Sequence, residues 1–456
     1  MDYHDFIRSK KHSQIEYGIA CDLDYPDAFD FQLYAAERAI RKGRYACFLD
    51  TGLGKTFIQL IVAQEYMRYT NKPVLIITPL AVAFQFIREA EKFGIDDIEY
   101  SKDGKYKSKI VVCNYERLDK FDSDDFDCVI LDESSILKNF KGATKSQVTS
   151  FIKKVKYRYL FTATPSPNDF IELGTSSEAL GYMGYMDMLG KFFTNNEDTI
   201  SPQSIGAKWV LKGHAEDKFF EWVSSWSLSM RKPSDVGFSD DRHVLPDLTT
   251  NHHKVFNENN LCVNGQHQLF AMPSTRLTEV REEQKATVEK RCEKAIDLAG
   301  THETSVFWCN LNSEADMLCS MNPDAKEIKG SMDLDRKEEL LLAFANGEIK
   351  KLITKAKITA FGLNWQHCNH TVYFPTFSYE QYYQSIRRFW RFGQKKPVTC
   401  DLVYSDGQEK VVQSLMAKAQ KANDLFSKLN QSTNSNYSDT IKQFNNDIIL
   451  PKFIGA

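Results

Sequence analysis

Short runs of apolar residues alternate with longer amphipathic segments through the first 170 residues of the chain. The first apolar run, YACFLD, is followed by TFIQLIVAQEYMRY, in which the apolar residues recur with the spacing of a helix. Continuous apolar strands that alternate with helices are typical of a parallel sheet covered on both faces. We therefore predict an α/β domain with its ligands at the carboxyl ends of the strands. The predicted strands read YACFLD, PVLIITP, KIVVCNY, DCVILDE and YRYLFTATP.

The pattern becomes helical and aromatic between residues 174 and 240. In the segment KFFEWVSSWSLSM, helical spacing places Phe219, Trp222, Val223 and Trp226 on one face. Such a stripe favours packing in a core, and a surface on which bases stack is the alternative. We therefore expect a helical insert whose aromatic face is buried.

A second series of strands and helices follows the insert. VLPDLTT has the pattern of an extended crossover, and TSVFWCN, IKKLITK and HTVYFPT are strand-like. EKVVQSLMAKAQKANDLFSKL predicts an amphipathic helix, whereas the polar NQSTNSNYSDT after it is typical of a flexible link. The pattern thus predicts an N-terminal lobe at residues 1–173, the helical insert at 174–240, a C-terminal lobe at 241–430 and a flexible tail at 431–456.

The composition leaves this picture unchanged, since 42% hydrophobic and 26% charged residues are ordinary for a soluble globular protein. The net charge is only -3, so a nucleic-acid partner would need a local basic surface. No run approaches the roughly 18 apolar residues of a membrane span, and the first residues are polar. We therefore expect a cytoplasmic protein without a membrane contact.

The ten cysteines are scattered and contain no CxxC pair. A zinc ribbon is therefore not expected, and a disulfide framework is implausible in a chain of this length. The segment HCNH, His367–His370, has the composition of a metal cluster. Its apolar, strand-like flanks favour an ordinary strand instead, and we expect no zinc.

The stretch FLDTGLGKT, Phe48–Thr56, ends in the Gly-Lys-Thr of a phosphate-binding loop. The usual GxxxxGK[ST] pattern asks for an earlier glycine where this chain has Leu49. Glycines let backbone N–H groups approach the phosphates, the lysine neutralises the β- and γ-phosphates, and the threonine hydroxyl binds Mg²⁺. We predict that ATP binds to Thr51, Gly52, Leu53, Gly54, Lys55 and Thr56.

The run CVILDESS delivers Asp132 and Glu133 to the end of a predicted strand, which is a Walker B arrangement. Asp132 would hold Mg²⁺ together with Thr56, and Glu133 would orient and deprotonate the attacking water. An acidic loop after a strand is common by itself. The phosphate-binding loop upstream, at a normal domain distance, favours the catalytic interpretation.

A third cluster, QSIRRFWRFGQ, lies far away at Gln384–Gln394. Arg388 and Arg391 are three residues apart, so on a helix they would share a face. Such a pair can reach a γ-phosphate as an arginine finger does. With Arg387 they could also form a solvated basic face, but the tryptophan and phenylalanine between them favour a buried, positioned helix.

Together these motifs resemble those of superfamily 2 helicases and translocases of the SWI/SNF-like branch. The resemblance is greatest to the compact DEAD-like helicases that bacteriophages and prophages encode, and it covers residues 25–430. In that branch the loop reads D-x-G-L-G-K-T, as Asp50–Thr56 do, so Leu49 is an ordinary variant. Further matches follow in order: FQ at Phe31–Gln32 (Q motif), ITPLAVAFQF (Ia), CNYERL (Ib), DESSILKN (II), TATPSPNDFIEL (III), FGLNWQ (V) and QSIRRFWRFGQ (VI).

The resemblance implies two tandem RecA-like lobes, parallel sheets flanked by helices, with ATP bound between them. It implies that Gln32 pairs with the adenine edge, that Gly362 and Asn364 belong to the ATP site, and that Arg391 is the finger. The expected nucleic-acid contacts are Thr78 and Pro79 of motif Ia, Asn114 and Tyr115 of motif Ib, and the nearby Lys138 and Lys141.

The function that the resemblance implies is that of an ATP-dependent DNA helicase or translocase. We expect it to act in phage or mobile-element DNA replication, recombination or repair, with single-stranded or junction DNA and proteins of those processes as partners in the bacterial host cytoplasm. Ser134 and Ser135 of motif II and the missing double glycine of motif V depart from the wider branch. Nothing resembles histone-reading modules, so nucleosome remodelling is not expected.

Two alternatives remain open from the sequence. An RNA helicase is disfavoured because motif II reads D-E-S-S rather than D-E-A-D. A nucleotide-switched clamp with little turnover is disfavoured because Glu133, Arg388 and Arg391 keep a hydrolytic set that a switch does not need.

Overall fold

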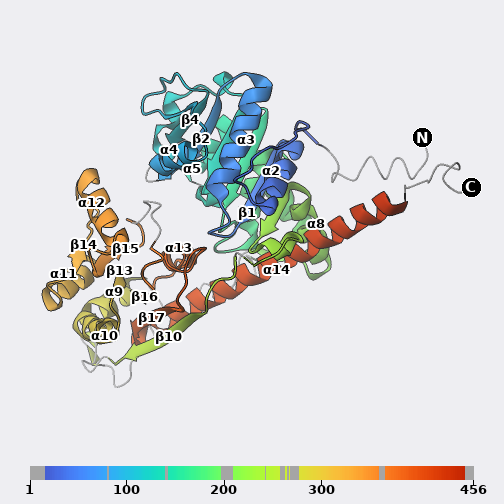
Figure 1. Cartoon of the computed structure of the whole chain (residues 1–456). Coiled ribbons are helices and arrows are strands. Elements are labelled where there is room, and N and C mark those ends of the chain that lie inside the picture. The colour runs from blue at the N-terminus through green and yellow to red at the C-terminus, as the bar shows by residue number, and fades with distance from the viewer. Residues whose placement is uncertain are drawn as a thin grey trace, which may run out of the picture. The chain divides into compact units, whose positions relative to one another are not determined.

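The structure is a computed structural model, and it divides the chain into two units (Figure 1). The first lobe runs to Arg242 and includes the chain from Ala422 onward, and the second lobe is His243–Lys421. The predicted insert at 174–240 is therefore part of the first lobe. The described residues are 16–79, 82–138, 142–196, 209–241, 243–256, 262–263, 266–267, 277–358 and 365–446.

The first lobe contains a seven-stranded sheet in the order β3-β4-β2-β5-β6-β1-β9, and every pairing is parallel. All five predicted runs are strands of this sheet. The two edge strands, β3 and β9, were not predicted, because they are too short and too polar to form a recognisable apolar run. The strands are β1 (Arg44–Leu49), β2 (Val74–Thr78), β3 (Ile98–Tyr100), β4 (Ile110–Asn114), β5 (Cys128–Asp132), β6 (Tyr157–Thr162) and β9 (Ser227–Met230).

Alternate residues of each central strand face opposite sides of this sheet, and both sides are buried. In β1, Cys47 and Leu49 face the core under α2, α3 and α4, whereas Ala46 and Phe48 face the other core. This double burial explains why the strands are continuous apolar runs. The helices of the lobe are α2 (Asp30–Lys42), α3 (Lys55–Thr70), α4 (Ala83–Lys92), α5 (Ala143–Ile152), α6 (Leu173–Leu180), α7 (Tyr185–Phe192) and α8 (Glu216–Trp226).

The aromatic stripe of the insert lies on α8 and packs in this second core. Phe219 and Trp226 are fully buried, and the Trp226 ring meets Phe48 of β1 edge-on at 6.1 Å. Trp222 is partly buried beside them. The predicted core packing is therefore confirmed. Two short strands, β7 (Phe193–Asn195) and β8 (Trp209–Leu211), pair antiparallel before α8.

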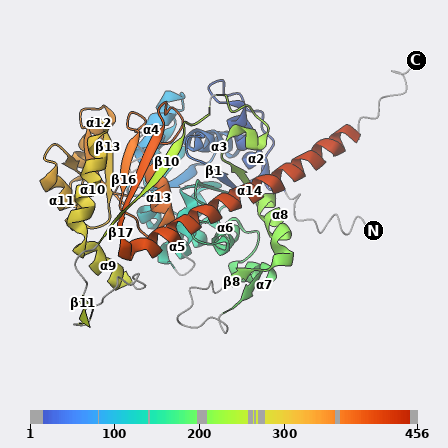
Figure 2. The same cartoon turned by 90° about the horizontal axis from the view of Figure 1, so that it is seen from below.

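The second lobe contains a six-stranded sheet in the order β10-β17-β16-β13-β15-β14, again with parallel pairings throughout. Figure 2 shows β10, β17 and β16 side by side. The predicted fold class, two parallel α/β lobes, is confirmed. The strands are β10 (Leu248–Val255), β13 (Ser305–Cys309), β14 (Lys326–Glu327), β15 (Lys351–Lys355), β16 (His370–Tyr373) and β17 (Val398–Ser405), besides the small pair β11 (Cys262–Val263) and β12 (Gln266–His267).

The helices of the second lobe cover both sides of its sheet. Alternation along the strands again divides the core, because Phe307 and Cys309 of β13 pack with α10 and α11, whereas Trp308 contacts the rings of Trp365 and Phe389. The helices are α9 (Leu277–Ala286), α10 (Val288–Gly300), α11 (Asn312–Met321), α12 (Leu334–Ala345) and α13 (Tyr379–Ile386).

A long helix, α14 (Glu409–Asn446), ends the described chain. The prediction of a flexible tail from residue 431 is therefore wrong up to Asn446. Neither glycine nor proline occurs between Glu409 and Leu450, so nothing in the backbone stops the helix where its sequence turns polar. None of the described helices, α14 included, is long and apolar enough to cross a membrane.

The helix also corrects the predicted end of the second lobe, which lies at Lys421 rather than at residue 430. Leu425, Phe426 and Leu429 of α14 are buried in the core of the first lobe. Lys428 forms an ion pair with Glu216 at the start of α8. The C-terminal part of α14 is thus a structural element of the first lobe.

Candidate active site

The predicted phosphate-binding loop joins β1 to the N-terminus of α3. Gly52 and Gly54 have φ angles of 89° and 76°, in the left-handed region that glycine adopts without strain. A Cβ atom at Gly54 would lie 2.1 Å from Nε2 of Gln32, so a side chain there would displace the Gln32 amide in addition to straining the backbone. The loop leads into a 16-residue helix whose N-terminal N–H groups and dipole favour a bound anion.

Lys55 is the first residue of α3, and its ammonium group turns back into the loop. Nζ donates to the carbonyl oxygens of Leu49 and Asp50, at 3.1 and 3.3 Å. These acceptors are neutral. A phosphate oxygen is a stronger acceptor for an ammonium group, because a charge-assisted hydrogen bond is worth more than a bond to a neutral carbonyl.

Asp132 ends β5 and is buried beside this loop. Its Oδ1 accepts a hydrogen bond from Nε2 of Gln59 at 2.8 Å, and its Oδ2 accepts one from the Thr78 hydroxyl at 3.0 Å. Burial holds the pKa of the Asp132 carboxyl above its ordinary value, although the Gln59 bond, the charge of Lys55 and the Thr78 bond lower it. The structure therefore brings Lys55 and Asp132, which are far apart in the sequence, to one edge of the sheet.

The oxygen donors at this edge fit Mg²⁺, which prefers oxygen ligands. Thr56 is half-buried at the start of α3, and the Asp132 carboxylate is buried. An ionised carboxylate only accepts, so the Gln59 amide must direct its nitrogen at Asp132. Oε1 of Gln59 is then a buried acceptor without a hydrogen-bond partner among the described residues. An unsatisfied buried oxygen next to a carboxylate suits a hydrated cation.

Glu133 follows β5 directly and has a φ angle of 50°. This left-handed conformation costs a residue other than glycine about 1–2 kcal/mol. It turns the chain out of the strand and into the short helix η5 (Ser134–Lys138), while the Glu133 side chain stays partly exposed. Strain of this kind is concentrated at functional sites. The role of Glu133 toward the attacking water stays a prediction.

Gln32 of α2 lies against the phosphate-binding loop. Its Oε1 accepts from the N–H of Phe29 at 3.0 Å, and its Nε2 donates to the carbonyl of Leu53 at 3.1 Å. The amide therefore helps to hold the loop. An adenine contact by Gln32 stays a prediction, and it would require one of these bonds to be exchanged. Leu53 itself is buried, and Thr51 is partly exposed.

The predicted nucleic-acid contacts of motifs Ia and Ib need correction, because their side chains are buried in the lobe. Thr78 is fully buried and bonds to Asp132. Asn114 and Tyr115 are 2% exposed, and the Tyr115 hydroxyl donates to the backbone carbonyl of Asp132 at 2.5 Å. Thr78 and Tyr115 therefore hold Asp132, whereas the Asn114 amide bonds to Tyr100 and Glu116. Pro79, after β2, is partly exposed.

Lys138 ends η5 and is partly exposed. Its charge lowers the pKa of Glu172, which burial raises. The Glu172 carboxylate accepts two hydrogen bonds from Asn168, at 2.8 and 3.1 Å, so the Asn-x-x-x-Glu pair of motif III forms a local clamp. Lys138 therefore lies near an acidic group of its own lobe. Lys141, Gly362 and Asn364 lie outside the described residues.

The arginines of motif VI are not on a helical face, and that prediction is wrong. Helix α13 ends at Ile386, and both Arg388 and Arg391 lie in the turns that follow. The carbonyl of Arg388 accepts from the N–H of Trp365 at 3.0 Å, and the buried Phe389 ring lies 5.7 Å from the Trp365 ring. These contacts pull the chain off the helical path. Both arginine side chains are partly exposed.

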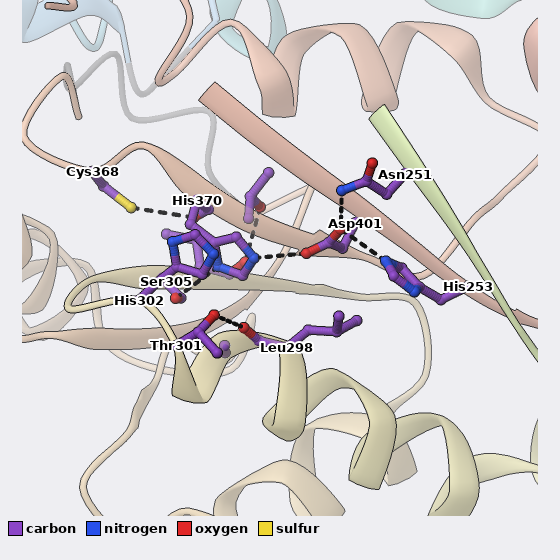
Figure 3. A network of polar contacts seen from close by, with 12 residues as sticks. Asn251, His253, Leu298, Thr301, His302, Ser305, Cys368, His370 and Asp401 are labelled. Atoms are coloured by element: carbon purple, nitrogen blue, oxygen red, sulfur yellow. Dashed lines mark hydrogen bonds and ion pairs between the residues drawn. The ribbon is translucent and has the colours of Figure 1, made fainter. Parts of the chain in front are cut away.

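The HCNH segment enters a network of hydrogen bonds in the second sheet (Figure 3). The buried His370 lies 2.8 Å from the Ser305 hydroxyl at Nδ1 and 2.9 Å from Asp401 at Nε2. His253 and Asn251 bond to the other carboxylate oxygen of Asp401, both at 2.9 Å. Hydrogen bonds from His370, Asn251 and His253 outweigh burial and lower the pKa of Asp401. Among the described residues, no three or more His, Cys, Asp or Glu side chains are grouped so that they could hold a metal ion.

Gln59 and the inward role of Thr78 were missed by the sequence interpretation. Gln59 follows Lys55 by four residues, one turn along α3, and it is the polar residue within the apolar stretch FIQLIV. A glutamine in an otherwise apolar helical stretch, one turn after a phosphate-binding lysine, was the signal that the sequence offered. For Thr78 no such signal existed, because only the order β2-β5 in the sheet brings it to Asp132.

The chain matches known families in both lobes. Residues 28–167 match the family of the type III restriction enzyme, res subunit, and residues 288–393 match the helicase conserved C-terminal domain. The two matches follow the order of the two lobes. The chain belongs to the superfamily 2 helicases and is homologous to their SWI/SNF-related members.

Among its relatives is the uncharacterized ATP-dependent helicase YqhH of Bacillus subtilis (strain 168), 27% identical over 229 residues, which are 47% of this chain and 41% of that protein. Another is the SWI/SNF-related matrix-associated actin-dependent regulator of chromatin subfamily A-like protein 1 of Xenopus tropicalis, 28% identical over 150 residues, 31% of this chain and 16% of that protein. The chain thus spans less than half the length of these relatives. The match with the solved structure "Sulfolobus solfataricus SWI2/SNF2 ATPase core in complex with dsDNA" covers 92% of this chain and 96% of that chain. The TM-score is 0.41 and the sequence identity is 16%.

Proposed function

We propose that this protein is an ATP-dependent DNA helicase or translocase that couples ATP hydrolysis to movement on DNA. The observation that supports this most strongly is the meeting of Lys55 and Asp132 at one sheet edge, with Gln59 and Thr78 holding the carboxylate. A phosphate-binding lysine next to a buried, oriented carboxylate is the first half of a nucleoside triphosphatase site. The membership in the superfamily agrees with this activity.

In the proposed reaction each residue has a separate task. Lys55 binds the β- and γ-phosphates, and Thr56 with Asp132 would hold Mg²⁺. Mg²⁺, when bound with ATP, neutralises charge on the phosphate oxygens. Glu133 orients the attacking water and accepts its proton. The Thr78 and Gln59 bonds keep the Asp132 carboxylate in place.

The second lobe would complete the site through Arg388 and Arg391. The transition state places negative charge on the γ-phosphoryl oxygens, and a guanidinium group stabilises that charge. Since both arginines are partly exposed and lie in turns, they are able to meet a ligand. Hydrolysis would then depend on the state of both lobes, which is what a motor requires.

The substrate we propose is DNA, bound mainly through its backbone and therefore in a salt-sensitive, sequence-independent way. The order of the motifs resembles that of helicases that bacteriophages and prophages encode. We therefore propose a role in replication, recombination or repair of phage or mobile-element DNA in a bacterial cytoplasm, with proteins of those processes as partners.

The test is the ATPase rate of the full chain with single-stranded DNA, duplex DNA, forked DNA and RNA, compared side by side. We expect DNA to raise the rate about tenfold or more, because binding closes the lobes on ATP. Stimulation by RNA alone would point to an RNA helicase, and indifference to every nucleic acid would point to a nucleotide-switched clamp.

Two variants separate the catalytic tasks in the same assay. Lys55→Ala should lose ATP binding, since it removes the charge that holds the phosphates. Glu133→Gln should bind ATP but lose turnover, because it removes the proton acceptor. Equal turnover in Glu133→Gln and the parent protein would refute the assignment of the base.

A further inference from the structure

Two arginine residues face each other on neighbouring parallel strands of the first lobe. Arg44 begins β1, Arg158 is the second residue of β6, and the register of the two strands pairs them. Like charges at facing positions of neighbouring strands repel each other. Burial and then the charge of Arg44 lower the pKa of Arg158 to about 10. The pair therefore destabilises the folded lobe unless other groups compensate its charge.

Backbone carbonyl groups compensate the charge of Arg158, which is only 7% exposed. Its guanidinium group donates to the carbonyls of Lys153 and Val155, which follow α5, and to those of Ala179 and Leu180, which end α6. The C-terminal end of a helix carries a partial negative charge, so these acceptors suit a cation. Arg158 therefore caps the ends of two helices.

Arg44 has no comparable compensation. Its Nε donates to the carbonyl of Lys156 at 3.3 Å, and its guanidinium group lies over the Tyr17 ring at 4.3 Å. Nη1 and Nη2 of Arg44 donate to no acceptor among the described residues, and no carboxylate among them forms an ion pair with this arginine. Glu178 of α6 is already paired with two lysines. Arg44 is therefore a partly exposed cation with N–H groups to offer a ligand.

The two guanidinium groups converge beside Gly181, the exposed glycine that follows α6. A Cβ atom at Gly181 would lie 2.9 Å from Nη1 of Arg158 and 3.5 Å from Nη1 of Arg44. The φ angle of Gly181 is 89°, in the left-handed region that favours glycine, so this point carries no side chain. A small group next to Gly181 would therefore be within reach of both cations.

We propose that Arg44 and Arg158 bind a phosphate-type oxyanion beside Gly181, at the end of β1 far from the phosphate-binding loop. Guanidinium N–H groups match the oxygen atoms of a phosphate or a carboxylate. A phosphoryl group carries up to two negative charges at neutral pH and a carboxylate carries one, so the phosphoryl group suits two facing arginines better. The bound anion removes the repulsion between them. The site shares no residue with the ATP site and does not depend on the proposed function.

The test follows the thermal unfolding of the full chain in phosphate and in chloride of equal ionic strength. Lys55→Ala is the starting protein, because it lacks the lysine of the phosphate-binding loop. Phosphate should raise its Tm by about 2 °C or more, since a ligand that binds only the folded state stabilises that state. Phosphoserine is the second probe. A shift with both probes assigns the site to phosphoryl groups in general, and a shift with inorganic phosphate alone assigns it to the free ion.

A substitution at Arg44 ties the effect to the site. Arg44→Gln removes the charge but keeps a donor for the Lys156 carbonyl, and it should lose the phosphate shift. The matched control is Arg41→Gln, which removes an exposed arginine paired with Glu37 and should retain the shift. Equal shifts in the two variants would overturn the proposal. No phosphate shift in Lys55→Ala, or an equal shift in acetate, would overturn it as well.

Amide hydrogen exchange gives a readout that needs no substitution in the site. Phosphate should slow the exchange of the Gly181 and Tyr182 amides in the Lys55→Ala protein. Unchanged exchange at both amides in the presence of phosphate would overturn the proposal, even if Arg44→Gln failed to fold.

Discussion

Asp132 shows how far single residues could be predicted. The sequence alone indicated its place after a strand and its partner Lys55, because both belong to motifs with fixed spacing. It could not indicate that Thr78 and Tyr115 turn inward to hold the residue. Their burial follows from the strand order β4-β2-β5, which is a tertiary property. Thr78 and Tyr115, which the resemblance assigned to nucleic-acid contacts, therefore hold the carboxylate and the backbone carbonyl of Asp132.

The stacked histidines of the second lobe give a prediction at the same scale. The His302 ring lies parallel to that of His370 at 3.7 Å (Figure 3). Burial and then His370 lower the pKa of His302; Asp401 raises it by less than either of these, and Lys351 lowers it slightly. The folded lobe therefore favours neutral His302. This contribution to stability is complete above the ordinary pKa of 6.5 and is lost as the pH falls below it.

We expect the free energy of unfolding of the second lobe to fall between pH 7 and pH 5.5, by at most about 1 kcal/mol because His302 is partly exposed and screened. His302→Phe keeps a stacked ring and should reduce the dependence; the part that remains belongs to His367, whose pKa burial also lowers. His252→Phe, a change at an exposed histidine of β10, should not. Urea unfolding followed by amide exchange in β13 and β16 measures this. The same change of the free energy of unfolding with pH in His302→Phe and the parent protein would contradict this expectation.

The lowered pKa of Asp401 also stabilises the folded lobe, but this contribution is lost only as the pH falls below 3.8.

Whole elements were predicted where their pattern was long and regular. The central strands and α3 followed from continuous apolar runs and helical spacing. The edge strand β9 reads SLSM, too short and polar to stand out, and it is a strand because β1 offers it an open edge. The end of α13 was also missed, since it depends on contacts of the following turns with Trp365 rather than on local sequence.

Helix α14 carries a testable consequence at this scale. Leu429 is fully buried in the first-lobe core, and Arg231 donates to the Ala422 carbonyl at 3.3 Å and stacks over Phe426 at 4.6 Å. Leu429→Ala should lower the free energy of unfolding of the first lobe by about 2–5 kcal/mol. Ser427→Ala, an exposed change on the same helix, is the matched control.

Hydrogen exchange locates the effect of Leu429→Ala. Amides of α8 should exchange faster in this variant, and amides of the second-lobe strand β13 should not. Faster exchange confined to the second lobe would show that this part of α14 does not belong to the first lobe.

For the whole molecule, the pattern of apolar runs predicted two parallel α/β lobes, and the structure confirms both. The family matches assign each lobe to a superfamily 2 helicase domain. The domain boundaries were less predictable, because the insert and the C-terminal part of α14 join the first lobe through packing between segments distant in sequence. Under the proposed function, ATP hydrolysis needs residues of both lobes.

The need for second-lobe residues is tested most directly by measuring the rate of DNA-stimulated ATP hydrolysis by Arg391→Ala. Because ground-state binding rests on first-lobe groups such as Lys55, ATP affinity should change little. Turnover should fall about 10³-fold or more, the usual cost of losing an arginine finger. Lys396→Ala, which removes an exposed cation five residues away, is the control and should keep the parental rate. A near-parental rate in both Arg391→Ala and Arg388→Ala would contradict the claim that the second lobe completes the site.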